Sequence, residues 1–217
     1  MAQTALITGA SRGIGRETSL LLARQGIRIA VHYRVQREKA EALVRCLQAS
    51  GADALSFQAD VADREQVTNM MHKIEQAFGG IDILVHCAGI AQQLLFTDIT
   101  PEDWRRMLTV SSMWGEVGAS CEVHYSAAKS AVIGMTKALA KELGPSGITV
   151  NCVSPGVIDT DMNNMLTQEA REALCEETPL CRIGTAREAA EAIAFLASGK
   201  ASFITGQVLG VNGGIVI

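Results

Sequence analysis

The segment that most constrains the fold lies within the first 33 residues of the chain. Thr4–Thr8 is a short apolar run of the kind that forms a buried parallel strand. Three glycines follow within seven residues: Gly9, Gly13 and Gly15. Residues 16–25 then have helical periodicity, and residues 27–33 form a second apolar run. This order predicts a β-loop-α-β unit, the building block of a doubly wound parallel sheet.

The glycine spacing predicts a dinucleotide-binding loop. Gly9 permits a tight turn after the strand, while Gly13 and Gly15 let the backbone and the helix approach a pyrophosphate closely. The pyrophosphate is expected on the exposed N–H groups at the helix N-terminus. The spacing is G-x-x-x-G-x-G rather than the commoner G-x-G-x-x-G, but it meets the same physical need.

The rest of the chain continues the alternation of strands and helices. Further strands are predicted at residues 54–58, 81–85, 148–153 and 207–211. Further helices are predicted at residues 37–50, 63–78, 101–108, 124–143 and 187–198. Residues 161–182 are expected to be mobile and partly helical, where a substrate lid would lie. The chain has 217 residues, which suits one α/β Rossmann-like domain, residues 1–217, with a sizeable core.

Composition excludes several classes of function. The net charge is -4 and there is no basic block, so neither nucleic acid nor an anionic membrane is an expected partner. The N-terminus lacks the features of a signal peptide, and no apolar run has transmembrane length. The six cysteines contain no C-x-x-C pair, and the four histidines show no metal-ligand spacing. We therefore expect a cytoplasmic protein with reduced cysteines and no metal site.

Tyr125 and Lys129 are the leading catalytic candidates. They are four residues apart, which places both side chains on one face of a helix. A free tyrosine has a pKa near 10, and a neighbouring ammonium lowers it toward the range of a general acid. Ser112, thirteen residues before Tyr125, would donate a hydrogen bond to the substrate oxygen. The Tyr-x-x-x-Lys pattern alone is frequent, and its alternative interpretation is helix packing.

The end of the second predicted strand indicates which nucleotide is bound. An acidic residue there would bind the adenosine ribose and repel a 2′-phosphate, but this strand ends His32-Tyr33-Arg34. Arg34 and Arg12 can supply positive charge to a phosphate, so we predict NADP rather than NAD. Two solvated surface arginines remain the alternative. Asp60, after the third strand, would lie toward the adenine, or else cap the helix that follows.

Together these motifs resemble the short-chain dehydrogenase/reductase family over nearly the whole chain. The resemblance implies that Ser112 orients the substrate, Tyr125 is the acid/base, and Lys129 lowers the tyrosine pKa and holds the nicotinamide ribose. It implies that Thr160 and the backbone near Ile158 bind the carboxamide. The residues implied in cofactor binding are Gly9, Ser11, Arg12, Gly13, Ile14, Gly15, Arg34, Asp60, Val61, Ala88, Gly89, Tyr125, Lys129, Pro155, Gly156, Ile158 and Thr160.

Within the family the chain is most similar to the 3-oxoacyl-acyl-carrier-protein reductases. The residues that carry this likeness are 150–156, 159–162 and the ending 205–214. Residues 112–125 also resemble a bacterial branch of elongation factor P 5-aminopentanone reductases, which reduce a ketone on a modified lysine of a protein partner. The resemblance therefore implies NADPH-dependent reduction of a small-molecule or carrier-linked ketone. The protein partner would be acyl carrier protein or elongation factor P.

Two departures from the family pattern bear on activity. The family's Asn-Asn-Ala-Gly is His86-Cys87-Ala88-Gly89 here, and Cys87 offers no amide to its neighbours. Only 22 residues separate Gly89 from Ser112, so roughly thirty residues of a helix and a strand are missing. Residues 108–112 alone remain to form the returning strand, and if they stay helical the sheet has a gap.

The missing helix would also carry the family's catalytic asparagine and much of its dimer interface. No asparagine occurs between Asn69 and Asn151, so the proton path through Lys129 is expected to be impaired and tetramer formation is in doubt. Three hypotheses stay open: a working carbonyl reductase, a catalytically impaired nucleotide-binding relative, and an unstable product without function. Turnover separates the first from the other two, and cofactor binding without turnover supports the second.

Overall fold

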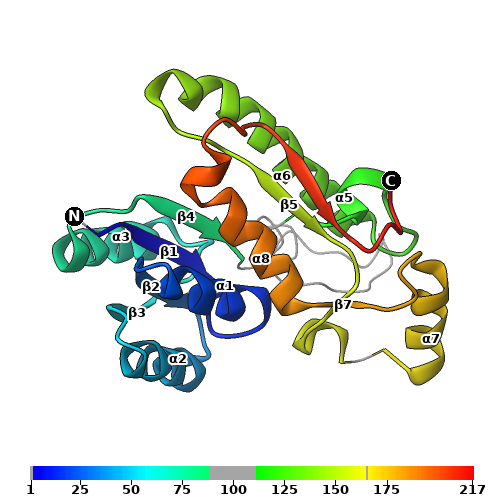
Figure 1. Cartoon of the computed structure of the whole chain (residues 1–217), viewed down its shortest axis with the longest axis horizontal. Helices are drawn as coiled ribbons and strands as arrows, with labels where there is room; N and C mark the ends of the chain where they lie inside the picture. Colours follow the sequence, from blue (N-terminus) through cyan, green and yellow to red (C-terminus); the bar gives the residue numbers. More distant parts are fainter. Residues whose placement is uncertain (1, 88–110, 165) are drawn as a thin grey trace. The chain divides into compact units, whose positions relative to one another are not determined.

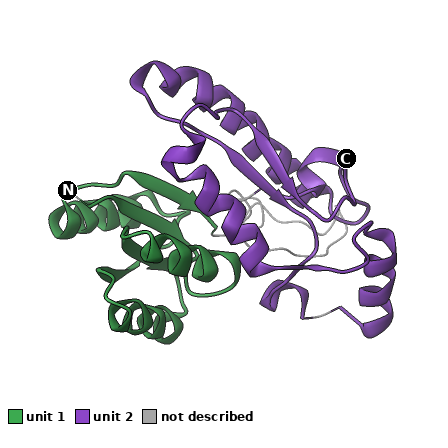
Figure 2. Ribbon diagram, viewed as in Figure 1, with its two compact units in different colours: residues 1–88 green, residues 89–217 purple. Residues whose placement is uncertain are grey.

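The computed structural model describes residues 2–87, 111–164 and 166–217 (Figure 1). The chain forms two compact units, residues 1–88 and residues 89–217 (Figure 2). Each unit has its own parallel strands with helices packed on them, which confirms the predicted α/β class. The units are described one at a time below.

Unit 1 holds a four-stranded parallel sheet in the order β3-β2-β1-β4. Its strands are β1 (Thr4–Thr8), β2 (Arg28–Tyr33), β3 (Ala54–Gln58) and β4 (Ile83–His86). Its helices are α1 (Gly13–Arg24), α2 (Arg37–Ala49) and α3 (Arg64–Phe78). The order of β3, β2 and β1 is the one that a β-loop-α-β unit followed by a second crossover produces, so the predicted Rossmann-like arrangement is confirmed.

The unit 1 core forms because β1 and β2 are apolar along almost their whole length. Every residue of β1 is buried, as expected for a central parallel strand covered on both faces. One cluster joins the sheet to α3: Leu6, Ala30, Phe57, Ala59, Met70, Ile74 and Phe78. The α3 residues recur at the spacing of one helix face, which explains why this polar helix docks on the sheet.

The part of unit 2 that the structure describes contains two separate pairs of parallel strands. The strand β5 (Cys152–Pro155) pairs with β8 (Val208–Val211), and β6 (Ile158–Asp159) pairs with β7 (Gly184–Thr185). The helices are α5 (Trp114–Val117), α6 (Val123–Leu143), α7 (Gln168–Glu177) and α8 (Ala186–Leu196). Short 3-10 turns occur at Gly144–Ser146, Asp161–Asn163 and Gly199–Ala201.

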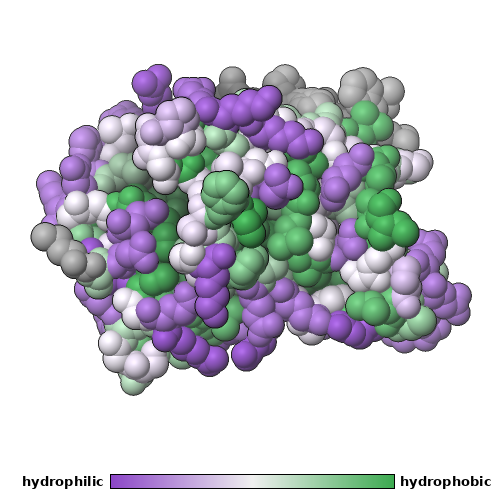
Figure 3. Space-filling view, turned by 45° about the horizontal axis from the view of Figure 1, so that its top comes forward, coloured by the Kyte–Doolittle hydropathy of each residue, from purple (hydrophilic) through white to green (hydrophobic). Residues whose placement is uncertain are grey.

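Within the described residues, β4 pairs only with β1, and β5 pairs only with β8. Ser111 and Ser112 are not in a strand, and the predicted helix at 101–108 lies outside the described residues. On β4, Leu84 is 53% exposed, whereas β1 is wholly buried. Figure 3 shows hydrophobic residues lying among hydrophilic ones on one face of the surface.

Most other predicted elements are present, with ends shifted by a few residues. The helical part predicted within residues 161–182 is α7, whose first turn Thr167 caps by accepting a hydrogen bond from the Ala170 N–H. One detail differs from the alternatives considered: α3 is capped by Asp63, whose carboxylate accepts from two backbone N–H groups, and not by Asp60.

Candidate functional site

Ser112, Tyr125 and Lys129 come together in unit 2, as the sequence predicts. All three side chains are buried, with exposed fractions of 8%, 9% and 3%. Tyr125 and Lys129 lie in the first two turns of α6, one helical turn apart. The Ser112 hydroxyl accepts a hydrogen bond from the Trp114 N–H over 3.3 Å and lies close enough to the Tyr125 phenol to lower its pKa. The buried hydroxyl groups of Ser112 and Tyr125, which lie close together, form the centre of the candidate site.

The segment around Ser112 is fixed by backbone contacts rather than by a strand. The Met113 N–H donates to the Pro155 carbonyl over 3.1 Å, which ties the segment to the end of β5. The Gly115 N–H donates to the Ser112 carbonyl over 2.8 Å, and this turn leads into α5. These two bonds hold Ser112 in place within unit 2, although Ser112 itself is not in a strand.

The short helix α5 packs tightly against α6 because Gly115 has no side chain. A Cβ atom at Gly115 would lie 2.7 Å from both the carbonyl carbon and the Cβ of Lys129. The Ser130 hydroxyl donates to the Gly115 carbonyl over 2.6 Å, across the same contact. Trp114, the residue before Gly115, packs against Tyr125 and Ala128 of α6. The position of Ser112 relative to Tyr125 therefore depends on close contact between two helices.

The pKa of Tyr125 is raised above its usual value, which is opposite to the expectation from the sequence. Burial of the phenol is the largest cause, because a phenolate is disfavoured away from water. The hydrogen bond from Ser112 lowers this pKa, and the negative charge of Glu122 raises it. Glu122, three residues before Tyr125, was not among the predicted site residues. The net result is a phenol that keeps its proton at neutral pH.

Lys129 contacts Tyr125 through the aromatic ring. Its Nζ lies 4.9 Å from the ring centroid, within the range of a cation–π interaction. The net shift of the Tyr125 pKa is nevertheless upward, opposite to the predicted lowering, because burial of the hydroxyl is the largest influence.

The glycine loop of unit 1 has the geometry expected for a dinucleotide. Gly9 and Gly13 have φ values of 66° and 54°, which L side chains rarely adopt. A Cβ at Gly15 would lie 2.6 Å from the Gly9 carbonyl oxygen, so only glycine lets α1 approach the loop this closely. The N-cap residue of α1 is Arg12, whose side chain makes no capping hydrogen bond to the helix, and the first turn of α1 contains no acidic residue. These features fit an anionic pyrophosphate at the start of α1. Ser11 and Ile14 belong to the same segment.

Arg34 and Asp60 lie together at the carboxyl ends of β2 and β3. Arg34 Nη1 is 3.6 Å from Asp60 Oδ2, and both side chains are partly exposed. Asp60 Oδ1 also accepts a hydrogen bond from the Ala62 N–H, and Val61 lies exposed between these two residues. The ends of parallel strands meet at one sheet edge, which is where open α/β sheets bind ligands. The pair thus joins the two residues that the sequence assigned to the adenosine end of the nucleotide.

The remaining predicted cofactor residues lie in unit 2, except Ala88 and Gly89, which lie outside the described residues. Gly156 follows β5, and a Cβ there would be 2.7 Å from Asn212 Cα. The Ile158 carbonyl accepts a hydrogen bond from Asn163 Nδ2 over 2.7 Å, and Thr160 Oγ1 lies 3.5 Å from the same oxygen. Pro155 is buried at the end of β5. The backbone near Ile158 is therefore held in place from within unit 2.

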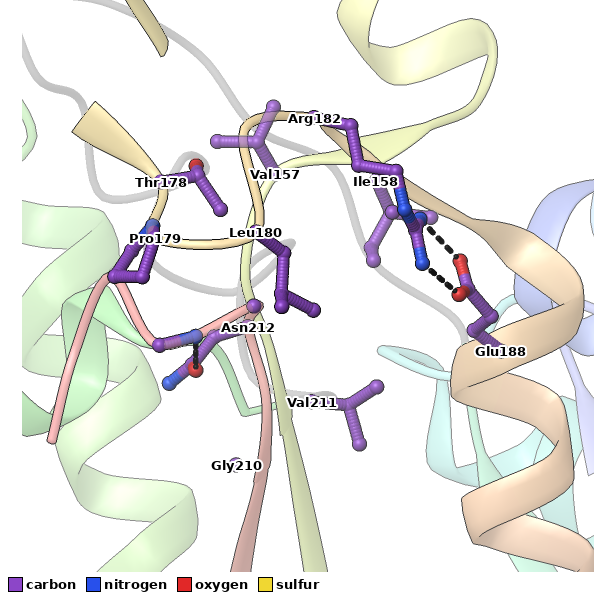
Figure 4. Close-up of a pocket in the computed structure, with 13 residues that line it drawn as sticks. Val157, Ile158, Thr178, Pro179, Leu180, Arg182, Glu188, Gly210, Val211 and Asn212 are labelled. Atoms are coloured by element: carbon purple, nitrogen blue, oxygen red, sulfur yellow. Dashed lines mark hydrogen bonds and ion pairs between the residues drawn. The ribbon is translucent and has the colours of Figure 1, made fainter. Parts of the chain in front are cut away.

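Val157 and Ile158 line a pocket of about 480 Å³ (Figure 4). Its other walls come from residues 178–180, which follow α7, and from residues 210–214 at the end of β8. Arg182 and Glu188 stand at one side, joined by two hydrogen bonds, and Arg182 lowers the pKa of Glu188 to about 2. The pocket thus borders the segment that the sequence assigned to the nicotinamide carboxamide.

Two further observations concern metal sites and membrane-spanning helices. Among the described residues, no group of three or more His, Cys, Asp and Glu side chains is arranged to hold a metal ion. None of the helices in residues 2–87, 111–164 and 166–217 combines the length and apolarity needed to cross a membrane.

Family models match both parts of the chain. The model described as short chain dehydrogenase matches residues 3–110, and that described as enoyl-(acyl carrier protein) reductase matches residues 106–216. The 3-oxoacyl-[acyl-carrier-protein] reductase FabG of Staphylococcus aureus is 39% identical, with 99% of this chain and 98% of the relative covered. The uncharacterized oxidoreductase YmfI of Bacillus subtilis is 40% identical, with 99% of each chain covered.

A 3-oxoacyl-[acyl-carrier-protein] reductase of Synechocystis is 38% identical, with 100% of this chain and 98% of the relative covered. The alignment with the Staphylococcus protein extends over 242 positions, and this chain has only 217 residues. At least 242 − 217 = 25 aligned positions therefore have no residue in this chain. The relatives thus support a chain shortened by roughly one helix and one strand.

Proposed function

The chain belongs to the short-chain dehydrogenase family of oxidoreductases, and we propose that it uses NADPH to reduce a ketone to a secondary alcohol. The proposed substrate is a 3-oxoacyl group carried as a thioester on acyl carrier protein. Relatives in Staphylococcus and Synechocystis that cover almost the whole chain are 3-oxoacyl-[acyl-carrier-protein] reductases by name. In this proposal both units serve one nucleotide-binding domain, residues 1–217, of a cytoplasmic enzyme.

The observation that carries the proposal is the burial of Ser112, Tyr125 and Lys129 together, with Ser112 close enough to lower the pKa of Tyr125 and Lys129 against the tyrosine ring. This arrangement survives although the chain lacks at least 25 positions of its relative. Two hydroxyl groups that meet at one point can both contact a single substrate oxygen. The site is therefore suited to a reaction in which charge develops on a carbonyl oxygen.

Each residue has a distinct part in the proposed reaction. Ser112 donates a hydrogen bond to the carbonyl oxygen and fixes its position. Tyr125 is protonated at neutral pH, as any tyrosine with an ordinary or raised pKa is, and donates its proton to that oxygen as the C–O double bond becomes single. Lys129 supplies positive charge beside the tyrosine, which stabilises the phenolate left behind. A bound reduced nicotinamide supplies the hydride to the carbonyl carbon.

The residues of the glycine loop and of the two strand ends would hold the nucleotide. Gly9, Gly13 and Gly15 shape the loop for the pyrophosphate, and the start of α1 offers backbone N–H groups to it. Arg34 would bind the 2′-phosphate of NADPH, and Ile158 and Thr160 would lie at the carboxamide.

A second candidate substrate is a ketone on elongation factor P. Residues 112–125 carry that likeness, but none of the relatives named above bears such a description. Assembly into a homo-oligomer also stays a prediction, since the missing helix carries much of the interface in the family.

The decisive experiment follows the absorbance of NADPH with the purified protein and a 3-oxoacyl thioester. Steady oxidation of NADPH, in proportion to protein, is the expected result. NADPH binding without oxidation of any ketone offered, including 5-aminopentanone-modified elongation factor P, would instead support a catalytically impaired relative. No binding and no turnover by a folded protein would contradict the proposal altogether.

Changing Arg34 to glutamine should weaken NADPH binding by roughly tenfold and leave NADH binding almost unchanged. One charged hydrogen-bonding group toward a phosphate contributes about this much, and NADH has no 2′-phosphate. Changing Asp60 to asparagine removes the carboxylate that competes for Arg34, so NADPH binding should strengthen. Dissociation constants from fluorescence titration at one salt concentration test both changes. Equal losses for the two nucleotides in the Arg34 variant would show that Arg34 does not select NADPH.

A further inference from the structure

His32 is a buried residue on β2 that the proposed mechanism does not use. Its ring is 2% exposed, and both ring nitrogens are engaged. The Gly9 N–H donates to His32 Nδ1 over 3.1 Å, at the first turn of the glycine loop. His32 Nε2 lies 3.0 Å from the Ala59 carbonyl oxygen, just after β3. One ring thus joins the loop after β1 to the end of β3, through β2.

The partners determine the protonation state of the ring. A backbone N–H can only donate, so Nδ1 must carry a lone pair toward Gly9. A carbonyl oxygen can only accept, so Nε2 must carry the hydrogen toward Ala59. The neutral ring with its hydrogen on Nε2 is the one form that makes both bonds. Protonation of Nδ1 would place two N–H groups against each other and break the bond to Gly9.

We propose that neutral His32 is a positioning residue for the dinucleotide loop, which makes nucleotide binding weaken as pH falls. Gly9 holds a left-handed conformation with φ of 66°, and the bond from its N–H to the ring helps to keep the turn in that shape. A loop already fixed in its binding shape loses less conformational freedom when the ligand binds. The inference rests on the proposed function for the identity of the nucleotide.

The surroundings of the ring set the direction of the pH effect. Burial is the largest influence and lowers the pKa of His32 below its usual 6.5. Within the described residues, the bond to Ala59 and the charge of Asp60 raise this pKa, and His86 at the end of β4 lowers it. The pKa of His32 is lower in the folded protein than in the unfolded chain, so protonation below pH 6.5 favours unfolding. The stability contributed by the neutral ring is therefore fully present above pH 6.5 and is lost as pH falls below 6.5.

Two matched substitutions separate the two ring bonds. In His32→Asn, the side-chain oxygen can occupy the place of Nδ1 and accept from Gly9, but asparagine is too short to reach Ala59. In His32→Gln, the side-chain nitrogen can occupy the place of Nε2 and donate to Ala59, while Gly9 loses its acceptor. Neither side chain titrates. The measurements are the dissociation constant of NADPH from pH 5.5 to 8, and the exchange rate of the Gly9 amide hydrogen by NMR at one pH.

The expected results differ between the variants. At pH 7.5, His32→Gln should bind NADPH about fivefold more weakly than the wild type, as expected for one lost hydrogen bond, and exchange the Gly9 amide faster. His32→Asn should bind almost as the wild type does at pH 7.5 and bind more tightly than it at pH 5.5. The Asn variant also controls for titration of the nucleotide's own phosphate.

Equal NADPH affinity in both variants at every pH, with unchanged Gly9 exchange, would overturn the role of His32. If the wild type bound no NADPH, the proposed function would fail. The exchange rate of the Gly9 amide would still test the role of His32. Faster exchange in His32→Gln alone would support the bond between His32 and the loop, and equal rates in both variants would contradict it.

Discussion

Replacing Tyr125 with phenylalanine should reduce ketone turnover by at least about a hundredfold, the usual contribution of a general acid. The substitution removes one hydroxyl and keeps the ring that Trp114 and Lys129 contact. Folding and NADPH affinity should therefore change little. The kcat for a 3-oxoacyl thioester, followed by NADPH absorbance, measures the loss.

The matched control is Tyr33→Phe, because Tyr33 is the chain's other tyrosine and is also buried. This control should keep its kcat, although it loses the same hydroxyl group from a different unit. If Tyr125→Phe kept wild-type turnover, Tyr125 would not be the acid. If both variants lost activity alongside their circular dichroism signal, the loss would reflect unfolding.

The raised pKa of Tyr125 adds a pH dependence to this prediction. At neutral pH the phenol is protonated, so it can supply the proton that ketone reduction needs. Deprotonation of Tyr125 should therefore not lower the reduction rate between pH 6 and 8. Oxidation of the alcohol needs the phenolate and should accelerate as pH rises toward the pKa of the phenol. An alcohol oxidation rate that is flat from pH 7 to 10 would contradict this assignment.

The fold of unit 1 was predictable because its local signals agree with one another. The apolar run Thr4–Thr8, the glycines and the two helical patterns all indicate a β-loop-α-β unit, and the structure has it. The grouping of Ser112, Tyr125 and Lys129 was likewise predictable from spacing and resemblance. Each of these predictions depends on residues close together in the sequence or on a known pattern.

Other features depend on packing between distant residues and could not be predicted. Burial is the largest influence on the pKa of Tyr125 and makes the net shift upward, opposite to the expected lowering, and sequence spacing does not reveal burial. His32 was treated only as part of a strand end, although its ring bonds to Gly9 and Ala59. Asp60 and Asp63 both precede α3, and only the structure shows that Asp63 caps it while Asp60 faces Arg34.

Replacing Gly115 with alanine should destabilise the protein and disable its catalytic site together. The new Cβ would lie 2.7 Å from the backbone and Cβ of Lys129, and neither of these is the flexible end of a side chain. Overpacking of this kind costs about 1–3 kcal/mol of unfolding free energy. The two helices would have to separate, which would move Ser112 away from Tyr125 and cut kcat even in the folded fraction.

Gly134→Ala is the matched control, because Gly134 is in the same helix α6 and a Cβ there meets nothing within 4 Å. This change should stabilise the protein by about 0.5–1 kcal/mol, since alanine is the better helix former. Urea unfolding followed by circular dichroism gives the free energy of unfolding of the two variants, and kcat is measured for each. The turn through Ser112 leads into α5, and Met113 just before α5 bonds to Pro155, so the close approach of α5 to α6 at Gly115 bears on where Ser112 lies. A Gly115→Ala variant as stable and active as Gly134→Ala would show that this contact does not position the site.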